Sequence, residues 1–176
     1  QLSEMLLKLS RLDYDQLERK QLDLVQLFQE QLRFYPKQAK RFEMTSRKKK
    51  ITVYGNEAAI SELINILIDN ALKYSTRSSK IMVRIFERRL MGGFEISNTG
   101  PTIPAENIPK LFDRFYRADT SRTQSSKNGY GLGLAIAKKI VDIHHGDLQV
   151  VSKAKTTTFT FFLPTSRMIA ANALTD

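Results

Sequence analysis

One long helical pattern constrains the fold of this chain more than any other feature of its sequence. Between Asn56 and Ser75-Thr76, apolar residues recur every three or four positions, which predicts a helix with a single buried face. Asn56 is a suitable N-cap, because its side-chain oxygen can accept a hydrogen bond from a first-turn amide. The apolar face consists of Ile60, Leu63, Ile64, Leu67 and Ala71. A helix of this kind has to pack against a sheet or against other helices.

Strand patterns lie on both sides of this helix. Ile81, Val83 and Ile85 alternate with another set of residues, Met82, Arg84 and Phe86, which predicts a strand. Gly92-Gly93 predicts a hairpin turn and Phe94–Ile96 the returning strand, with a break at Asn98–Pro101. Further strands are expected at 51–54, 148–151 and 157–163, the last with Phe159, Phe161 and Leu163 on one face.

The remaining apolar patterns predict further helices. They include a face of Leu24, Leu27, Phe28, Leu32 and Tyr35, a short helix near 108–115, and a helix from Gly131–Gly133 to Gly146. The polar stretch between Arg117 and Tyr130 is long enough to be a functional loop. This order predicts an α+β fold, an α/β sandwich in which helices cover one face of a mixed, mostly antiparallel sheet, with an additional N-terminal helix.

The composition narrows the classes of partner. Lys and Arg number 28 against 18 Asp and Glu, a formal net charge of +10, which favours polyanions such as nucleic acid, an anionic membrane face or a nucleotide phosphate. Much of this charge lies in Lys37–Lys50, a segment that also fits a solvated surface. This segment has one aromatic residue, Phe42, and neither a pattern of interleaved aromatic residues nor a known reading helix, so we expect no nucleic-acid partner. The absence of Cys excludes disulfides and cysteine metal sites.

Asn70, Lys73 and Tyr74 form the first candidate site. Positions three and four apart lie on one face of a helix, so the three side chains point the same way. An Asn oxygen suits Mg²⁺ that takes its other ligands from water and phosphates, and Lys73 supplies a charge for phosphate oxygens. The same three residues would also suit the wet side of any surface helix.

A glycine-rich segment forms the second candidate. Gly129, Gly131 and Gly133 alternate directly before a helix, where bare backbone and free N–H groups attract phosphates. The alternative is a turn that only closes a loop. The spacing fits neither the P-loop nor the dinucleotide-binding motif.

In combination, these segments resemble the motifs of sensor histidine kinases. Ile66–Ser75 resembles the N box, Ile96–Pro104 the first glycine box, Leu111–Asp119 the F box and Gly129–Ile136 the second glycine box. They follow one another in the family's order and cover roughly residues 55–163. The resemblance implies the Bergerat (GHKL-type) ATP-binding fold, with ATP and Mg²⁺ as cofactors.

The resemblance also implies roles for individual residues. Asn70 would coordinate Mg²⁺ and Lys73 would contact phosphate, which makes these two the expected catalytic residues. Phe112 and Phe115 would anchor the lid in the core. The other residues expected to bind the nucleotide are Tyr74, Asn98, Gly100, Ile103, Arg117, Gly129, Gly131, Leu132, Gly133 and Thr157.

Three departures from the family pattern concern this site. Asn98 stands where Asp is usual, so the bond to the adenine amino group should be weaker by about 1 kcal/mol. Thr102 replaces a usual Gly and should stiffen the loop entrance. Ala154-Lys155-Thr156 replaces a usual Gly-x-Gly.

The resemblance suggests how the chain is organised. Residues 1–20 resemble the second helix of the dimerisation and histidine-phosphotransfer domain, residues 21–165 the catalytic domain, and 166–176 a tail. His144 and His145 resemble a structural pair, so the phosphoacceptor histidine would lie elsewhere.

The expected activity is phosphoryl transfer from Mg-ATP to that histidine and on to an Asp of a response regulator. The expected setting is a homodimer whose catalytic domain is cytoplasmic and whose upstream part is anchored in the membrane. Two alternatives stay open: a different ATPase of the same fold, similar to gyrase or a chaperone, and a non-enzymatic module that signals by dimerising or binds nucleic acid.

Overall fold

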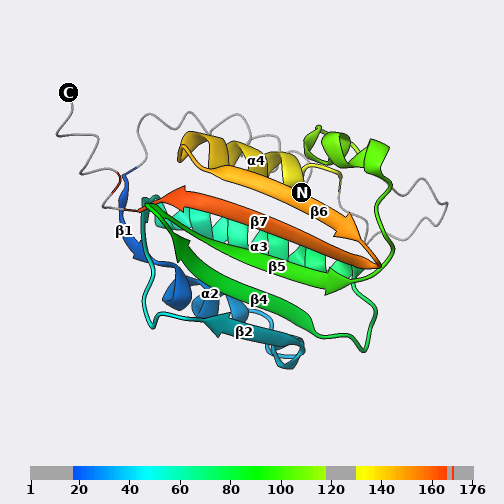
Figure 1. Ribbon diagram of the computed structural model, residues 1–176, viewed down its shortest axis with the longest axis horizontal. Coiled ribbons are helices and arrows are strands. Elements are labelled where there is room, and N and C mark those ends of the chain that lie inside the picture. The colour runs from blue at the N-terminus through cyan, green and yellow to red at the C-terminus, as the bar shows by residue number, and fades with distance from the viewer. Residues whose placement is uncertain (1–17, 118–129, 166–167, 169–176) are drawn as a thin grey trace.

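A five-stranded sheet forms the framework of the domain (Figure 1). The computed structural model describes residues 18–117, 130–165 and 168. The strands run in the order β2-β4-β5-β7-β6, with β2 parallel to β4 and all other neighbours antiparallel. Their bounds are β2 Phe42–Ser46, β4 Ile81–Arg88, β5 Met91–Thr99, β6 Asp147–Lys153 and β7 Thr156–Pro164. A second, two-stranded sheet pairs β1 (Lys20–Asp23) with β3 (Thr52–Gly55) in antiparallel fashion.

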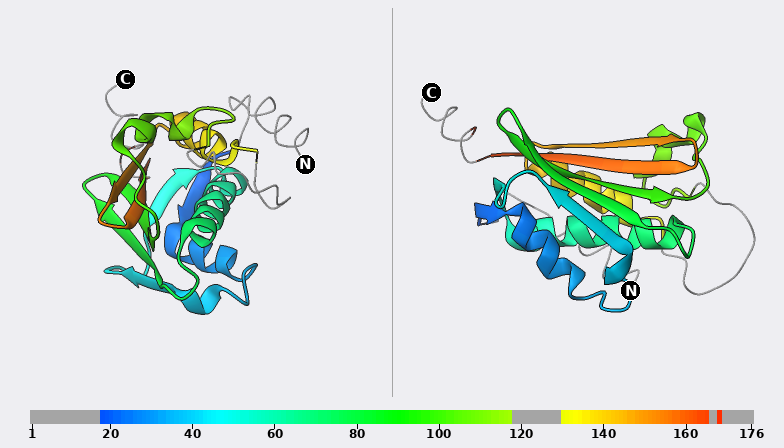
Figure 2. Two further views of the ribbon diagram at one scale, coloured as in Figure 1. Left: turned by 90° about the vertical axis from the view of Figure 1, so that its right-hand side faces the viewer. Right: turned by 60° about the horizontal axis from the view of Figure 1, so that its bottom comes forward.

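Among the described residues, three α-helices lie on one face of the sheet (Figure 2). They are α2 (Leu24–Leu32), α3 (Glu57–Tyr74) and α4 (Gly133–Ile143). Two 3₁₀ helices, η2 (Ala39–Arg41) and η3 (Ala105–Phe112), belong to the connections. The predicted α+β sandwich with helices on one face is confirmed. None of the described helices has the length and apolar character needed to cross a bilayer.

The core lies between α2, α3 and the inner face of the sheet. Phe94 on β5 packs edge-to-face on Phe161 of β7 and on Phe28 of α2, with ring centres 4.2 and 5.3 Å apart. All three rings are fully buried, as is the predicted apolar face of α3. Such edge-to-face pairs add stability beyond the burial of their area.

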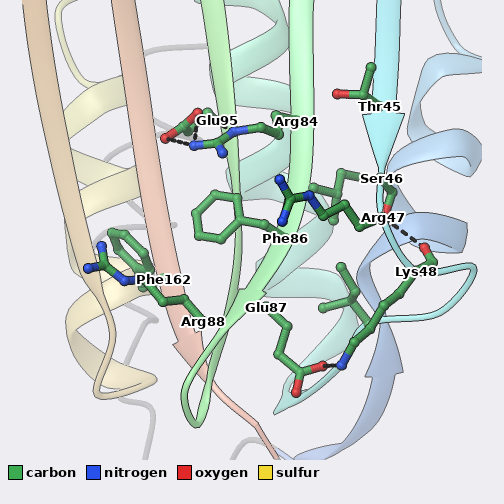
Figure 3. Close-up of a pocket in the computed structure, with 12 residues that line it drawn as sticks. Thr45, Ser46, Arg47, Lys48, Arg84, Phe86, Glu87, Arg88, Glu95 and Phe162 are labelled. Atoms are coloured by element: carbon green, nitrogen blue, oxygen red, sulfur yellow. Dashed lines mark hydrogen bonds and ion pairs between the residues drawn. The ribbon is translucent and has the colours of Figure 1, made fainter.

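The outer face of the sheet carries a different set of residues. Because successive side chains of a strand point to opposite faces, Arg84, Phe86 and Phe162 lie on the side away from the helices (Figure 3). Arg84 donates two hydrogen bonds to Glu95, both 2.8 Å long. The two faces therefore present separate surfaces with different chemistry.

The predicted hairpin turn at Gly92-Gly93 is wrong. The turn is formed by Arg89, whose φ is +57°, and Leu90, and both glycines lie inside β5. A Cβ at Gly93 would lie 2.1 Å from the Phe161 carbonyl oxygen. These glycines are thus explained by close approach of a neighbouring backbone, a requirement that resembles a turn signal in the sequence.

Other element boundaries also differ from the sequence prediction. The break expected at Asn98 comes later, because β5 continues to Thr99. The short helix expected near 108–115 is the earlier 3₁₀ helix Ala105–Phe112. Strands β1 and β2 were not predicted. Both are short, and β2 follows directly after the basic residues of η2 at the edge of the sheet.

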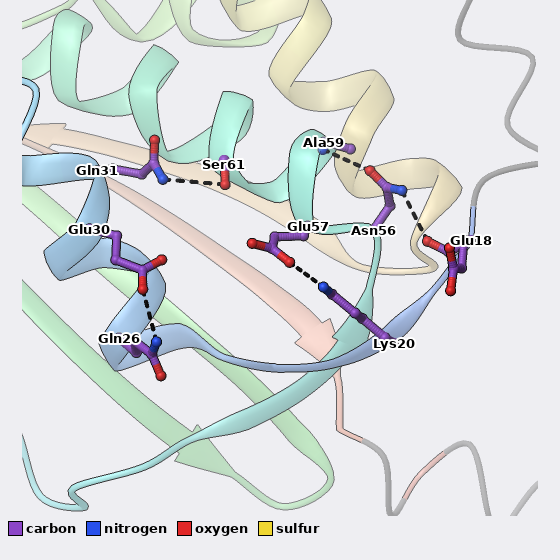
Figure 4. Close-up of polar contacts among 9 residues, drawn as sticks. All are labelled: Glu18, Lys20, Gln26, Glu30, Gln31, Asn56, Glu57, Ala59 and Ser61. Carbon is purple, nitrogen blue, oxygen red and sulfur yellow. Dashed lines mark hydrogen bonds and ion pairs between the residues drawn. The ribbon is translucent and has the colours of Figure 1, made fainter.

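The start of α3 is capped as predicted. The Asn56 side chain accepts a hydrogen bond from the Ala59 amide at 3.0 Å and donates one to the Glu18 carbonyl at 3.0 Å (Figure 4). Next to it, Lys20 of β1 forms an ion pair with Glu57 in the first turn of α3. These contacts join β1 to the beginning of α3.

His144 has a structural position, in agreement with the sequence prediction. Its side chain is only 2% exposed, its Nδ1–H donates to the Ile140 carbonyl at 2.7 Å, and its Nε2 accepts from the Asn56 amide at 3.0 Å. Only the neutral ring protonated on Nδ1 makes both bonds. The end of α4 is thereby bonded to the beginning of α3.

This arrangement makes stability depend on pH. Burial lowers the pKa of His144 below its ordinary value of 6.5, so the unfolded chain binds the proton more readily. Stability should therefore be full above pH 6.5 and fall as the pH drops towards the folded pKa. Urea unfolding from pH 7.5 to 5 should show this loss, and His144→Gln should remove part of it while costing about 1–3 kcal/mol at pH 7.5.

His145→Gln provides the matched control, because His145 is exposed on the adjacent position. In this variant, the free energy of unfolding should depend on pH as it does in the unmodified chain. Equal pH slopes for His144→Gln and the unmodified chain would contradict the role assigned to His144.

Candidate functional site

The last turns of α3 carry the first group of candidate residues. Asn70 is half-buried, whereas Lys73 and Tyr74 are exposed. Lys73 Nζ lies 5.0 Å from the centre of the Tyr74 ring, within cation–π distance. The amide therefore lies deeper in the site than the cation and the aromatic ring.

Asn98 and Thr157 form a polar spot on the apolar inner face of the sheet. They are register partners on β5 and β7 and are 4% and 5% exposed. Thr157 Oγ1 shares a 2.8 Å hydrogen bond with Ser152 Oγ of β6. An amide and a hydroxyl in such surroundings are suited to orienting a polar edge of a bound ring.

Gly100 brings this polar spot to the end of α3. A Cβ at Gly100 would lie 2.1 Å from the Tyr74 carbonyl oxygen and 3.5 Å from Asn98 Nδ2. The Thr76 amide also donates to the Thr99 carbonyl at 2.9 Å. The residues predicted near adenine therefore adjoin those predicted near phosphate, and the missing side chain of Gly100 permits this contact.

Two of the departures from the family pattern contact each other. Ala154 and Lys155 form a tight turn with φ of +50° and +60°, a conformation that favours glycine. The Lys155 amide donates to Thr102 Oγ1 at 3.0 Å, and the Lys155 carbonyl accepts from the Gly100 amide at 2.9 Å. Thr102 thus ties the loop entrance to this turn, and Ile103 is tied to β6 through its amide, which donates to Ser152 Oγ at 2.9 Å.

Gly131 requires the backbone freedom of glycine. Its φ is +71°, its carbonyl accepts from the Phe115 amide at 3.0 Å, and a Cβ would lie 2.8 Å from the Tyr116 carbonyl oxygen. Leu132 is fully buried, and Gly133 begins α4. This glycine therefore connects the second glycine box to the F box.

The beginning of α4 lies beside α3. A Cβ at Gly133 would lie 3.5 Å from Ile66, which precedes Asn70 by four positions on α3. Among the described residues, no side chain caps the first turn of α4, and that turn contains no acidic residue. Its amides and the positive end of the helix dipole are available to an anion.

The expectation that both F-box phenylalanines anchor the lid in the core is wrong for Phe115. Phe112 is partly buried and packs on the core, but Phe115 is 57% exposed. The φ of Phe115 is +65°, and this left-handed residue turns the chain before it bonds to Gly131. Arg117 is exposed at the end of this segment, while Gly129 lies outside the described residues.

Comparison with known proteins identifies the family. Residues 55–167 match the family described as histidine kinase-, DNA gyrase B- and HSP90-like ATPase, over more than half of the chain. The chain belongs to this ATPase family. The match covers every element from the N-cap of α3 to β7, and thus the whole of the candidate site.

Proteins and solved structures that resemble this chain are named as sensor kinases or histidine kinases. The chain is 43% identical to the probable sensor kinase SilS of Salmonella typhimurium over 112 residues, 64% of this chain and 22% of SilS. It thus spans only about a quarter of its curated relatives. The solved catalytic domain of histidine kinase ThkA superposes with a TM-score of 0.74 at 25% identity, over 85% of this chain and 99% of that one.

Two more distant structures share the fold. Full-length ShkA, solved in complex with AMPPNP, superposes with a TM-score of 0.79 at 19% identity, over 93% of this chain and 35% of that one. ThkA in complex with the response regulator protein TrrA gives 0.76 at 22% identity, over 94% and 47% of the two chains.

The donor set of this ATPase domain fits a weakly held Mg²⁺. Among the described residues, no three His, Asp or Glu side chains gather as a metal site. Asn70 provides one neutral oxygen, which suits a cation that takes its remaining ligands from water and phosphates. Next to it, Asp69 accepts a 2.9 Å hydrogen bond from Tyr35, and its pKa is raised by burial.

Arg41 was missed in the sequence, where it belonged to the basic segment. Its guanidinium donates to Ser75 Oγ at 2.7 Å and to the carbonyls of Thr76 and Ser79 at 2.8 and 3.1 Å. These acceptors lie directly after α3, so Arg41 holds the segment that follows Lys73 and Tyr74. No local pattern indicates this, because the partners are 34–38 positions away.

Removing Arg41 should loosen this end of the ATPase domain. Arg41→Ala leaves several acceptors without their charged donor and should reduce the free energy of unfolding by about 2 kcal/mol. Urea unfolding measures this change. Lys40→Ala, at an exposed neighbouring position, should change it by less than about 0.5 kcal/mol, and an equal loss in both variants would contradict the role of Arg41.

Proposed function

We propose that this chain positions Mg-ATP for transfer of the γ-phosphoryl group to a histidine that lies outside it. One observation carries the proposal: the C-terminal half of α3 adjoins both the Asn98–Thr157 pair, through Gly100, and the start of α4, which no described side chain caps. The Asn98–Thr157 pair would bind adenine. The last turns of α3 would supply a cation and an amide, and the start of α4 would bind an anion. Membership of the ATPase family supports the same assignment.

The adenine end would be read by the inner face of the sheet. The Asn98 side-chain oxygen would accept the adenine amino proton, and Thr157 beside it would contact the ring. Gly100 would let the end of α3 approach this pair, because any side chain there would collide with the Tyr74 carbonyl. Tyr74 and Ile103 would lie at the walls of this site.

The phosphate end would be held mainly by main-chain groups. Amides from Gly129 to Gly133 would donate to the phosphates, with Lys73 and Arg117 adding positive charge. A bound Mg²⁺ would supply positive charge that offsets the negative charge of the phosphates during transfer of the γ-phosphoryl group. Asn70 would hold this cation by its side-chain oxygen and so fix the γ-phosphoryl group relative to the acceptor.

The full-length protein is proposed to be a sensor histidine kinase. The relatives are named as sensor kinases, and this chain matches about a quarter of their length. That proposal includes an acceptor histidine outside this chain and dimerisation through residues 1–20 and the segment upstream. It also includes a membrane anchor and a cytoplasmic location of this domain. Onward transfer to a response regulator, the partner seen with ThkA, belongs to it as well.

Calorimetric titration with a non-hydrolysable ATP analogue tests the nucleotide site. Binding should depend on Mg²⁺, and Asn70→Asp should weaken it at least about tenfold, because a carboxylate would face the triphosphate. Gln29→Glu adds the same charge on the exposed side of α2 and should leave affinity unchanged. Equal affinity for Asn70→Asp and the unmodified chain would overturn the site.

Asn98→Asp should strengthen the same binding. A charged acceptor makes a stronger bond to the adenine amino group, and a gain of about 1 kcal/mol corresponds to roughly fivefold tighter binding. Guanine nucleotide analogues, which lack that amino group, should gain nothing. A gain of equal size for both bases would show that Asn98 does not read adenine.

A transfer assay with radiolabelled ATP tests the reaction. The chain alone should not label itself, whereas an added helix pair that carries the acceptor histidine should gain acid-labile label. Steady release of phosphate without label on that helix pair would instead favour an ATPase similar to gyrase or HSP90. Stable phosphohistidine on the isolated chain would contradict the proposal that the acceptor lies outside it.

A further inference from the structure

A hollow of about 780 Å³ lies on the outer face of the sheet, away from the helices (Figure 3). It is lined by the end of β2, the loop that follows it, and strand β4, with Phe162 of β7 at one side. The candidate nucleotide site faces the helices instead. In the β4–β5 register Asn98 pairs with Ile81 at the start of β4, whereas Arg88 at its end pairs with Met91. The two sites therefore differ in both face and end of the sheet.

The floor of this hollow is aromatic. Phe86 and Phe162 pack edge-to-face with ring centres 5.5 Å apart. The Arg84 guanidinium lies 5.1 Å from the centre of the Phe86 ring and bonds to Glu95 through two 2.8 Å hydrogen bonds. Arg84 is thus already bonded to a carboxylate of the chain itself while it rests on the Phe86 ring.

The hollow also carries cations that are not neutralised. Its two carboxylates, Glu87 and Glu95, are bonded to Lys48 and Arg84. Within the described part of the chain, neither Arg47 nor Arg88 is paired with a carboxylate, although both line the hollow. The exposed Lys49, Lys50 and Arg89 lie in the adjoining loop and turn. An excess of positive charge thus surrounds an apolar floor.

We propose that this hollow binds an acidic segment of a partner protein, one in which carboxylates flank an apolar side chain. Arg47 and Arg88 would bind the carboxylates, and Phe86 and Phe162 would contact the apolar side chain. Charge complementarity selects an anionic partner. The apolar floor requires part of that partner to enter the hollow, and a peptide side chain can do so.

Other anionic partners fit this geometry less well. A flat membrane surface would not enter the hollow that Phe86 and Phe162 line. A nucleic acid would need ring faces for stacking bases, but the two phenylalanines pack on each other. The binding of a short acidic segment is independent of nucleotide binding at the other site.

Fluorescence anisotropy with a labelled octapeptide of alternating glutamate and leucine tests this proposal. The 176-residue chain should bind it, and should bind a matched glutamine–leucine peptide at least about tenfold more weakly. The double variant R47Q/R88Q should lower affinity for the acidic peptide by about tenfold as well. Its affinity for the ATP analogue should not change, which separates this result from the test of the nucleotide site.

The double variant K139Q/K153Q is the matched control, because it removes two exposed cations from α4 and β6. It should bind the acidic peptide like the unmodified chain. An equal loss of peptide affinity in both double variants would show that only net charge matters, and it would overturn the proposed site. Backbone amide NMR shifts caused by the peptide should centre on β2 and the end of β4, and shifts centred elsewhere would also overturn it.

Vesicles with 30% phosphatidylserine and a single-stranded oligonucleotide serve as competitors. Neither should displace the peptide at equal charge concentration. Tighter binding of either one, lost in R47Q/R88Q, would reassign the hollow to lipid or to nucleic acid and overturn the proposal.

Discussion

The contact between the end of α3 and the end of β5 is the constraint on which the candidate site depends. Gly100 lies against the Tyr74 carbonyl so closely that no side chain fits between them. This contact sets Asn98 beside the turn that carries Asn70 and Lys73. Arg41 fixes the segment beyond that turn, and the bonds of Lys155 to Gly100 and Thr102 fix the chain beyond β5. The polar groups of the candidate site are thus held in place by contacts between residues of the chain itself.

The two ends of α3 have opposite characters. At its beginning, the Ala59 amide donates to the Asn56 side chain, and the Asn56 amide donates to His144. Its last turns carry Asn70, Lys73 and Tyr74. The start of α4 lies beside this helix, and no described side chain caps it. Rigidity at one end and available polar groups at the other suit a site that must hold a charged ligand in one geometry. The open face of the sheet adds a second surface with its own aromatic and cationic groups.

Much of the fold could be predicted from local sequence patterns. The helix from Asn56, the strand with Ile81, Val83 and Ile85, and the inward face of β7 are periodic and long enough to be read reliably. The patterns failed where one residue type serves two purposes. Gly92-Gly93 resembled a turn but permits close strand packing, and Phe115 resembled a core residue but is exposed.

By itself, the sequence determined the order of helices and strands, the buried face of α3, and the four motifs that place the chain in its family. These features are local, because helix and strand periods and glycine spacing act over a few residues. Only the tertiary structure decided that Asn98 lies within a strand beside Thr157, that Thr102 bonds to Lys155, and that Arg41 secures the end of α3. Those contacts join residues 34–59 positions apart, and the free energy that selects them comes from packing the whole core.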